Sequence, residues 1–76
     1  MDWRELSSSV IARVAYSEAS RTLTMEFRSG TTYQYYDVPP TTYQEFIEAA
    51  SAGGYFADHI RGVYRFARIG TSDAVD

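Results

Sequence analysis

Alternating apolar and polar residues predict two strands early in the chain. The alternation is most regular in residues 22–28, where Leu23, Met25 and Phe27 are expected to face inward. The residues between them, including Thr24, are expected to face water. In residues 10–17 the pattern is less regular, and the more apolar side consists of Val10, Ala12, Val14 and Tyr16.

A third strand is predicted for residues 31–36, within the stretch TTYQYYDVPP. Side chains alternate along a strand, so Tyr33 and Tyr35 share one face, whereas Gln34 and Tyr36 share the other. The turn before this strand contains Gly30, which adopts positive φ without steric cost. Short connections between the three segments predict an antiparallel meander. The two prolines at the end of the stretch must take the chain out of the sheet.

Apolar residues then recur at helical spacing, at Tyr43, Phe46, Ile47 and Ala50. Thr42 and Glu45 have the spacing of a capping box at the start of this helix. We expect Gly53 and Gly54 to end it, and a second helix to span residues 55–60, with Gly62 after its last residue.

The predicted fold class is therefore α+β: a three-stranded antiparallel β-meander followed by two short helices packed on one face. Residues 63–69 fit either a short fourth strand or an extended arm. We expect a single domain over residues 8–69, with poorly ordered termini at residues 1–7 and 70–76.

Composition narrows the class of protein. The 76 residues include no cysteine, which excludes disulfides and Cys-based zinc sites and suits a reducing cytoplasm. Charged residues interrupt the N-terminal segment where a signal peptide would be apolar. We therefore expect a cytoplasmic protein that has no cofactor, no metal and no membrane association. The sequence leaves the oligomeric state open, with a monomer favoured.

The charge is unevenly distributed along the chain. Seven arginines, no lysines and ten acidic residues give a net charge of −3, which argues against binding nucleic acid over the whole surface. Residues 61–69, however, contain Arg61, Arg65 and Arg68 and no acidic residue. Positive charge is thus concentrated in one short segment near the C-terminal end.

Several motifs in this order resemble the KTSC domain, a module found at the C-terminus of some lysyl-tRNA synthetases and as small bacterial proteins. They are SRTLTMEFRSG at residues 20–30, YQYYDVPP at 33–40 and GGYFADHIRG at 53–62. The family's Tyr-x-Tyr motif corresponds to Tyr33 and Tyr35. Relatives often have a proline between two aromatic residues after HIRG, whereas this chain has Arg65 between Tyr64 and Phe66. The resemblance implies no established activity, and the synthetase context implies RNA as a ligand.

Two interpretations of the basic segment remain open. In the first, Tyr36, His59, Arg61, Tyr64, Arg65 and Arg68 bind single-stranded RNA or tRNA, with aromatic rings stacking on bases and guanidinium groups contacting phosphates. In the second, Tyr64 and Phe66 fill the core and the arginines pair with carboxylates such as Glu26, Glu45, Glu48 or Asp58. For Tyr33 and Tyr35, packing in the core is favoured.

The sequence does not favour an enzyme. His59 is the only histidine, and its neighbour Asp58 points about 100° away from it on a helix, so the two do not face each other. The alternative to RNA binding is a protein-interaction module that uses a sheet edge or the same basic segment.

Overall fold

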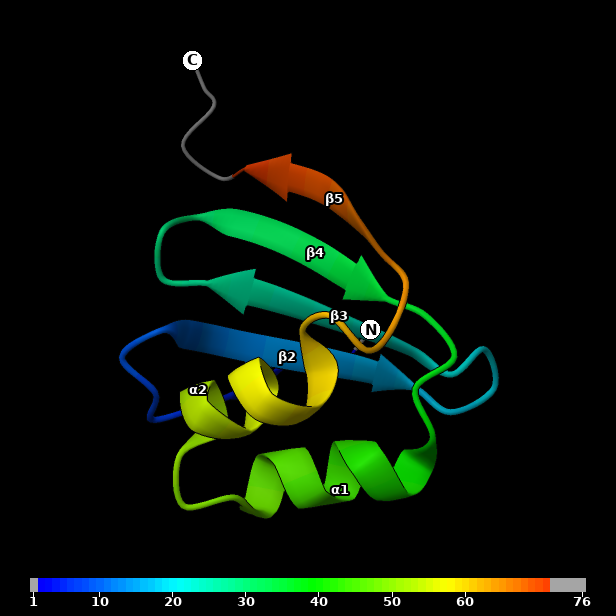
Figure 1. Cartoon of the computed structure of the whole chain (residues 1–76). Helices are drawn as coiled ribbons and strands as arrows, with labels where there is room; N and C mark the ends of the chain where they lie inside the picture. The colour runs from blue at the N-terminus through cyan, green and yellow to red at the C-terminus, as the bar shows by residue number, and fades with distance from the viewer. Residues whose placement is uncertain (1, 72–76) are drawn as a thin grey trace.

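The computed structural model describes residues 2–71, and this part of the chain contains one five-stranded antiparallel sheet (Figure 1). The strands follow each other across the sheet in chain order. They are β1 (Arg4–Glu5), β2 (Ile11–Ser17), β3 (Thr22–Phe27), β4 (Thr31–Tyr35) and β5 (Phe66–Thr71).

The α+β class and the antiparallel meander are confirmed, but the predicted three or four strands understate the sheet. Strand β5 is the fourth strand that the sequence allowed. Strand β1 lies in the N-terminal segment expected to be poorly ordered, and its two residues pair with Val14 and Arg13 of β2. Residues 70–76 were also expected to be poorly ordered. Of these, residues 72–76 lie outside the described part of the chain.

The helices α1 (Pro40–Glu48), α2 (Ala52–Tyr55) and η1 (Phe56–Ile60) all lie on the same side of the sheet (Figure 1). Helix α1 begins with Pro40 after Pro39, and no side chain caps its first turn. The predicted capping box of Thr42 and Glu45 is therefore wrong. A proline at the first helical position needs no partner for its missing N–H, which makes this start favourable.

The two glycines expected to break the helical region instead lie inside α2. The hydroxyl of Ser51 accepts a hydrogen bond from the backbone N–H of Gly54 at 3.0 Å, so the second helix begins three residues earlier than predicted. It continues into η1, a π-helical turn closed by the bond from the Arg61 N–H to the Phe56 carbonyl. Gly62, at φ 81°, ends this helix as predicted.

A β-bulge decides which residues of β2 face the helices. Ile11 pairs with Phe27 and Arg13 pairs with Glu26, so β2 contains one extra residue at this point. The alternation therefore slips, and Ile11 is fully buried together with Val14. Val10, which the sequence places on the more apolar side of this strand, is 48% exposed.

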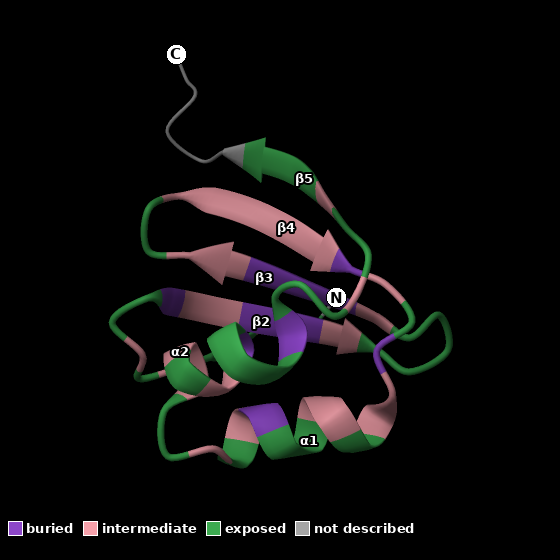
Figure 2. Ribbon diagram, in the orientation of Figure 1, coloured by how far each residue is buried: buried purple, intermediate pink, exposed green. Residues whose placement is uncertain are grey.

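The core lies between the helices and the sheet, where Figure 2 shows buried residues along β2, β3 and η1. The strands contribute Leu23 and Met25 as predicted, and Phe46 contributes from α1. The remaining core residues are Ile11, Val14, Tyr35, Val38, Phe56 and Ile60. Tyr33, Tyr43 and Ile47 pack against this cluster and remain partly exposed.

We predict that Phe46→Ala lowers the free energy of unfolding by about 3–5 kcal/mol, because it removes a fully buried ring and leaves a cavity. A chain of this length has only about 4–11 kcal/mol of stability, so the variant should be close to unfolding at room temperature. Urea denaturation followed by circular dichroism measures the change. Thr41→Ala, at an exposed position of the same helix, is the matched control and should change the midpoint little. A loss below about 1 kcal/mol at Phe46 would contradict this packing.

Candidate functional site

We define the open face as the side of the sheet opposite the helices. Its centre is a row of small or short side chains that the strand register places side by side: Ala15, Thr24, Gln34 and Ala67. Ala15 and Thr24 are buried although no helix of the described chain covers them. The expectation that Thr24 faces water is thus wrong, because its neighbours on the sheet shield it. Its hydroxyl accepts a hydrogen bond from the Gln34 amide at 3.3 Å.

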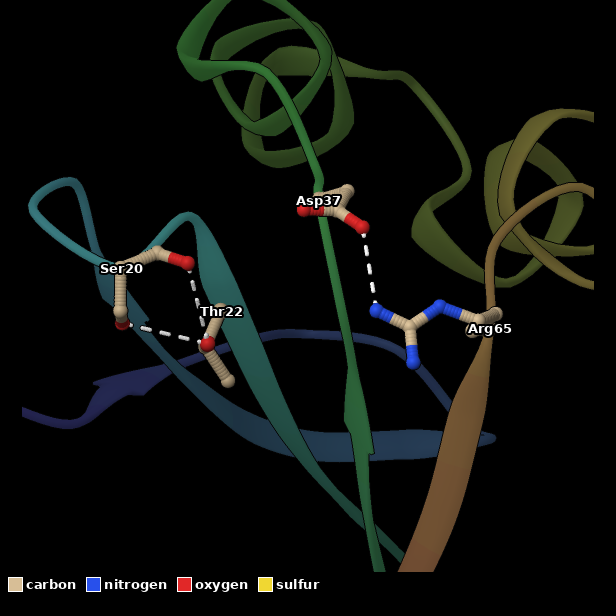
Figure 3. Close-up of polar contacts among 4 residues, drawn as sticks. All are labelled: Ser20, Thr22, Asp37 and Arg65. Atoms are coloured by element: carbon tan, nitrogen blue, oxygen red, sulfur yellow. Dashed lines mark hydrogen bonds and ion pairs between the residues drawn. The ribbon is translucent and has the colours of Figure 1, made fainter.

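Tyr36 and Arg65 lie next to each other on this face. The Tyr36 N–H donates to the Arg65 carbonyl at 2.9 Å, and the Arg65 guanidinium lies 5.4 Å from the centre of the Tyr36 ring. The phenol of Tyr36 donates to the Gln34 amide oxygen. Arg65 also pairs with Asp37 at 3.1 Å, as Figure 3 shows. The result is an exposed cation held beside an aromatic ring.

Asp37 has a backbone conformation that is unusual for a residue other than glycine, with φ at 60°. The residues on both sides fix it: Tyr36 is bonded to Arg65, and the Val38 N–H donates to the Arg21 carbonyl at 2.9 Å. The Val38 carbonyl in turn accepts from the Tyr16 phenol at 2.6 Å. The position of the Asp37 carboxylate beside Arg65 therefore depends on the fixed backbone as well as on the side-chain rotamer.

A second cluster of an arginine, an aromatic ring and a carboxylate lies on the β1 side of the open face. The Arg13 guanidinium lies 4.3 Å from the centre of the Trp3 ring and forms an ion pair with Glu26. The two ion pairs differ in exposure. Both side chains of the Arg65–Asp37 pair are more than 75% exposed, at 76% and 79%, whereas those of Arg13 and Glu26 are 41% and 19% exposed. Arg65 is thus the more available cation.

Between these clusters the open face is hollowed. A depression of about 490 Å³ is lined by Asp2, Ala15, Tyr16, Ser17, Ser20, Thr22, Thr24 and Gln34. Hydroxyl groups dominate this lining, and the Thr22 hydroxyl is itself bonded to the Ser20 hydroxyl and carbonyl (Figure 3). Another concavity of about 530 Å³, between residues 4–10 and the α1–α2 connection, contains none of the predicted site residues.

The structure does not bring the six predicted RNA-binding residues to one surface. Of the six, Tyr36 and Arg65 lie on the open face. Arg68 is opposite Tyr33, so its side chain is on the helix side of β5. Arg61 follows η1 on that same side, close enough to influence the phenol of Tyr35.

The other two predicted residues, Tyr64 and His59, are engaged by the helices. Tyr64 packs against the core, and its phenol contacts the Thr42 hydroxyl at 3.3 Å. The ring of His59 lies 4.5 Å from that of Tyr55. The second interpretation was therefore right for Tyr64, whereas Phe66 remains 57% exposed.

Sequence reasoning missed Trp3, Arg13 and Asp37 as members of the open face. The alternation in residues 10–17 does place Arg13 and Val14 on opposite faces of the strand. This pattern could have indicated that Arg13 lies on the open face. Trp3 joins the face only because β1 pairs with β2, and a two-residue strand leaves no periodic pattern in the sequence.

The Tyr-x-Tyr motif is structural. Tyr35 is buried between Phe56 and Phe66, and Tyr33 contacts Phe27 and Phe66, with ring centres 5.6–5.7 Å apart. Burial, with a smaller contribution from neighbouring Tyr33, raises the pKa of Tyr35 to about 12, and Arg61 opposes this effect. Burial and a hydrogen bond to Glu45 likewise raise the pKa of Tyr55 to about 12.

Two features are absent from residues 2–71. In that part of the chain no helix has the length and apolarity needed to cross a bilayer. Nor do three or more His, Asp or Glu side chains there form a group able to hold a metal ion.

Comparison with known proteins decides the family. The model of the KTSC domain matches residues 7–64. The chain belongs to the KTSC domain family. A crystal structure of a KTSC domain protein from Yersinia pestis is similar to this KTSC domain, with a TM-score of 0.88 and 36% identity, over 91% of this chain and 97% of that one.

Sequence relatives of this KTSC domain are of two kinds. Lysine–tRNA ligase of Nostoc punctiforme is 38% identical over 61 residues, which cover 80% of this chain but 11% of the ligase. The KTSC domain thus spans about a ninth of the length of the ligases it matches. An uncharacterised protein of Stutzerimonas stutzeri is 37% identical over 65 residues, which cover 84% of this chain and 92% of that protein.

The raised pKa of Tyr35 predicts a loss of stability in alkali. The unfolded phenol ionises near pH 10 and the folded one near pH 12, so the stabilisation is complete below pH 10 and is lost as the pH rises to about 12. Absorbance at about 295 nm should show a late ionisation step, and urea midpoints should fall across this range. Tyr35→Phe should reduce the late step, and Tyr55→Phe should reduce it further. An unchanged step in Tyr35→Phe would contradict the burial of its phenol.

Proposed function

We propose that this KTSC domain binds single-stranded RNA, such as an unpaired segment of tRNA, on the open face of its sheet. The observation that carries the proposal is the pair formed by Tyr36 and Arg65, a partly exposed ring with an exposed guanidinium 5.4 Å from its centre. Base stacking on an aromatic ring and phosphate binding by arginine are the two interactions by which proteins hold single strands.

The ion pair of Arg65 with Asp37 is compatible with this role. Exposed ion pairs contribute only about 0–1 kcal/mol, so an RNA phosphate can replace Asp37 at little cost. In the absence of RNA, Asp37 and its fixed backbone hold the Arg65 guanidinium beside the Tyr36 ring. Arg13 is more firmly held by Glu26, and we assign it mainly to the orientation of the Trp3 ring.

The size and composition of the face support a short single strand. Trp3 and Tyr36 flank the row of small side chains, so bases stacked on them would lie at the two sides of the depression. The hydroxyls of the depression and the Gln34 amide offer donors and acceptors to ribose and base edges. The relationship to a segment of lysine–tRNA ligases adds the expectation that the RNA is tRNA.

The proposal is binding without a chemical step, in the cytoplasm where tRNA is charged. His59, the residue best suited to proton transfer, stacks on Tyr55 on the helix side and is far in the fold from the open face.

Tyr36→Ala should weaken binding of a short single-stranded RNA by about 5- to 150-fold, because each base stacked on an aromatic ring contributes about 1–3 kcal/mol. Tyr36→Phe keeps the ring and should bind almost as well as the wild type. Fluorescence anisotropy gives the affinities, and backbone amide shifts give the surface. Shifts should appear on β2, β3 and β4 and around Arg65.

Arginine variants provide a test of the face itself. The guanidinium group of Arg65 predicts a salt slope of about −0.7, or about a 2.6-fold loss of affinity from 50 to 200 mM salt, and Arg65→Ala should bring this slope close to zero. Arg61→Ala is the matched control, since it removes the same charge from an exposed position on the helix side, after η1 and outside β5. Binding on the open face would be refuted if the two arginine variants changed the RNA affinity equally, or if RNA caused no amide shifts at low salt.

A protein-interaction module is the competing function, and one observation favours it. The outer edge of β5 is exposed and apolar, with Phe66 57% and Ile69 51% exposed. This edge is a different surface from the open face, so the two functions do not exclude each other.

A further inference from the structure

Within residues 2–71 no strand pairs with the outer edge of β5, and this edge carries a short, regular set of backbone hydrogen-bonding groups. Tyr36 and Arg65 form a hydrogen-bonded pair, and such pairs alternate along an antiparallel ladder. Ala67, opposite Gln34, therefore also bonds to β4. The N–H and carbonyl groups of Phe66 and Arg68 point away from β4, toward the free edge.

The opposite edge of the sheet is protected, because β1 contains only two residues. The β5 edge lacks this protection between residues 64 and 68. It contains no proline, and its exposed side chains include Phe66 on the helix side and Val63, 61% exposed, just before the strand. A bulge at Ile69 ends the regular pairing geometry, so the available segment is short.

We propose that this edge pairs with the same edge of a second copy of the chain. In an antiparallel arrangement centred on Ala67, Phe66 of each copy lies opposite Arg68 of the other. The outward-facing groups of the two copies then match completely and form four backbone hydrogen bonds. The sequence alone favoured a monomer, and this geometry changes that expectation to a reversible dimer.

Side-chain chemistry favours a second copy in this register. Each Arg68 faces a phenyl ring rather than another guanidinium, which replaces a like-charge contact by a cation–π contact. Phe66 already stacks on Tyr35, 5.6 Å between ring centres, so its ring is held for this contact. Because a two-fold axis at Ala67 is perpendicular to the sheet, the open faces of the two copies form one continuous surface. A single short strand pair buries little area, so the dimer should be weak.

Disulfide trapping tests the proposal directly, because the chain has no cysteine of its own. In this register Ala67 lies opposite Ala67 of the second copy as a non-hydrogen-bonded pair, with Cα atoms about 4.5 Å apart, which is within the range that a disulfide spans. Ala67→Cys should therefore form a covalent dimer in mild oxidant. Ile69→Cys is the register control, since its two copies would be about 14 Å apart along the strands. Ala57→Cys, exposed on η1, reports random collision.

A backbone variant tests the same edge without cysteine. Arg68→Pro removes an N–H that makes no bond to β4, so the domain should still fold, which circular dichroism would verify. Sedimentation should show that this variant no longer forms the dimer. Arg68→Ala removes the same side chain but keeps the N–H, and should retain more dimer than Arg68→Pro.

The proposal is overturned if Ala67→Cys dimerises no faster than Ala57→Cys, or if Ile69→Cys dimerises as fast as Ala67→Cys. It is also overturned if no cross-link forms while an acidic extended peptide shifts the amides of β5, since the edge would then serve another partner.

Discussion

The structure depends on one constraint: within residues 2–71, the helices cover only one face of the sheet. Helix α1 has nine residues, and α2 and η1 together form one further short helix on the same side. A chain of about 75 residues buries only about 60% of its unfolded surface, so a second covering layer is not available. The other face must be stable in contact with water. Small side chains that shield each other, such as Ala15 and Thr24, meet this requirement and line the depression of this face.

An aromatic cluster compensates for the thin core and also explains the Tyr-x-Tyr motif. Tyr35 joins η1 to β5, because its ring contacts both Phe56 and Phe66. Tyr33 joins β3 to β5 through Phe27 and Phe66. Strand β5 follows a long connection and is therefore attached to the sheet by rings as well as by the backbone ladder. The motif tyrosines hold the last strand in place, and the strand then positions Arg65.

Local rules were sufficient for the centre of the fold. Residues 22–28 alternate cleanly, and Leu23 and Met25 are buried as predicted. The helical spacing of Phe46 and the positive φ of Gly62 were also predictable from the sequence. These features depend on neighbours within a few residues, where periodicity and glycine chemistry act.

The wrong predictions concern residues whose structure depends on contacts with segments distant in the sequence. The bulge in β2 depends on how β3 pairs with it, and no local pattern marks it. Gly53 and Gly54 are poor helix formers, but the Ser51 cap and the burial of Phe56 outweigh that preference. The placement of the predicted site residues depends on the sheet in the same way. The basic segment lies on two surfaces, because Arg65 and Arg68 are three residues apart along an extended chain and project to opposite sides.

This separation of the arginines gives the acidic chain two chemically different surfaces. Arg65 faces the open side, beside an aromatic ring and a carboxylate that can release it. Arg68 projects from the helix side at the free edge, next to Phe66. A net charge of −3 opposes general attraction to nucleic acid, so affinity must come from stacking and from a few placed cations. Pairing through β5 would double both contributions on one surface, because the two open faces would be continuous. A weak domain of this size would then gain RNA affinity through avidity rather than through a larger site.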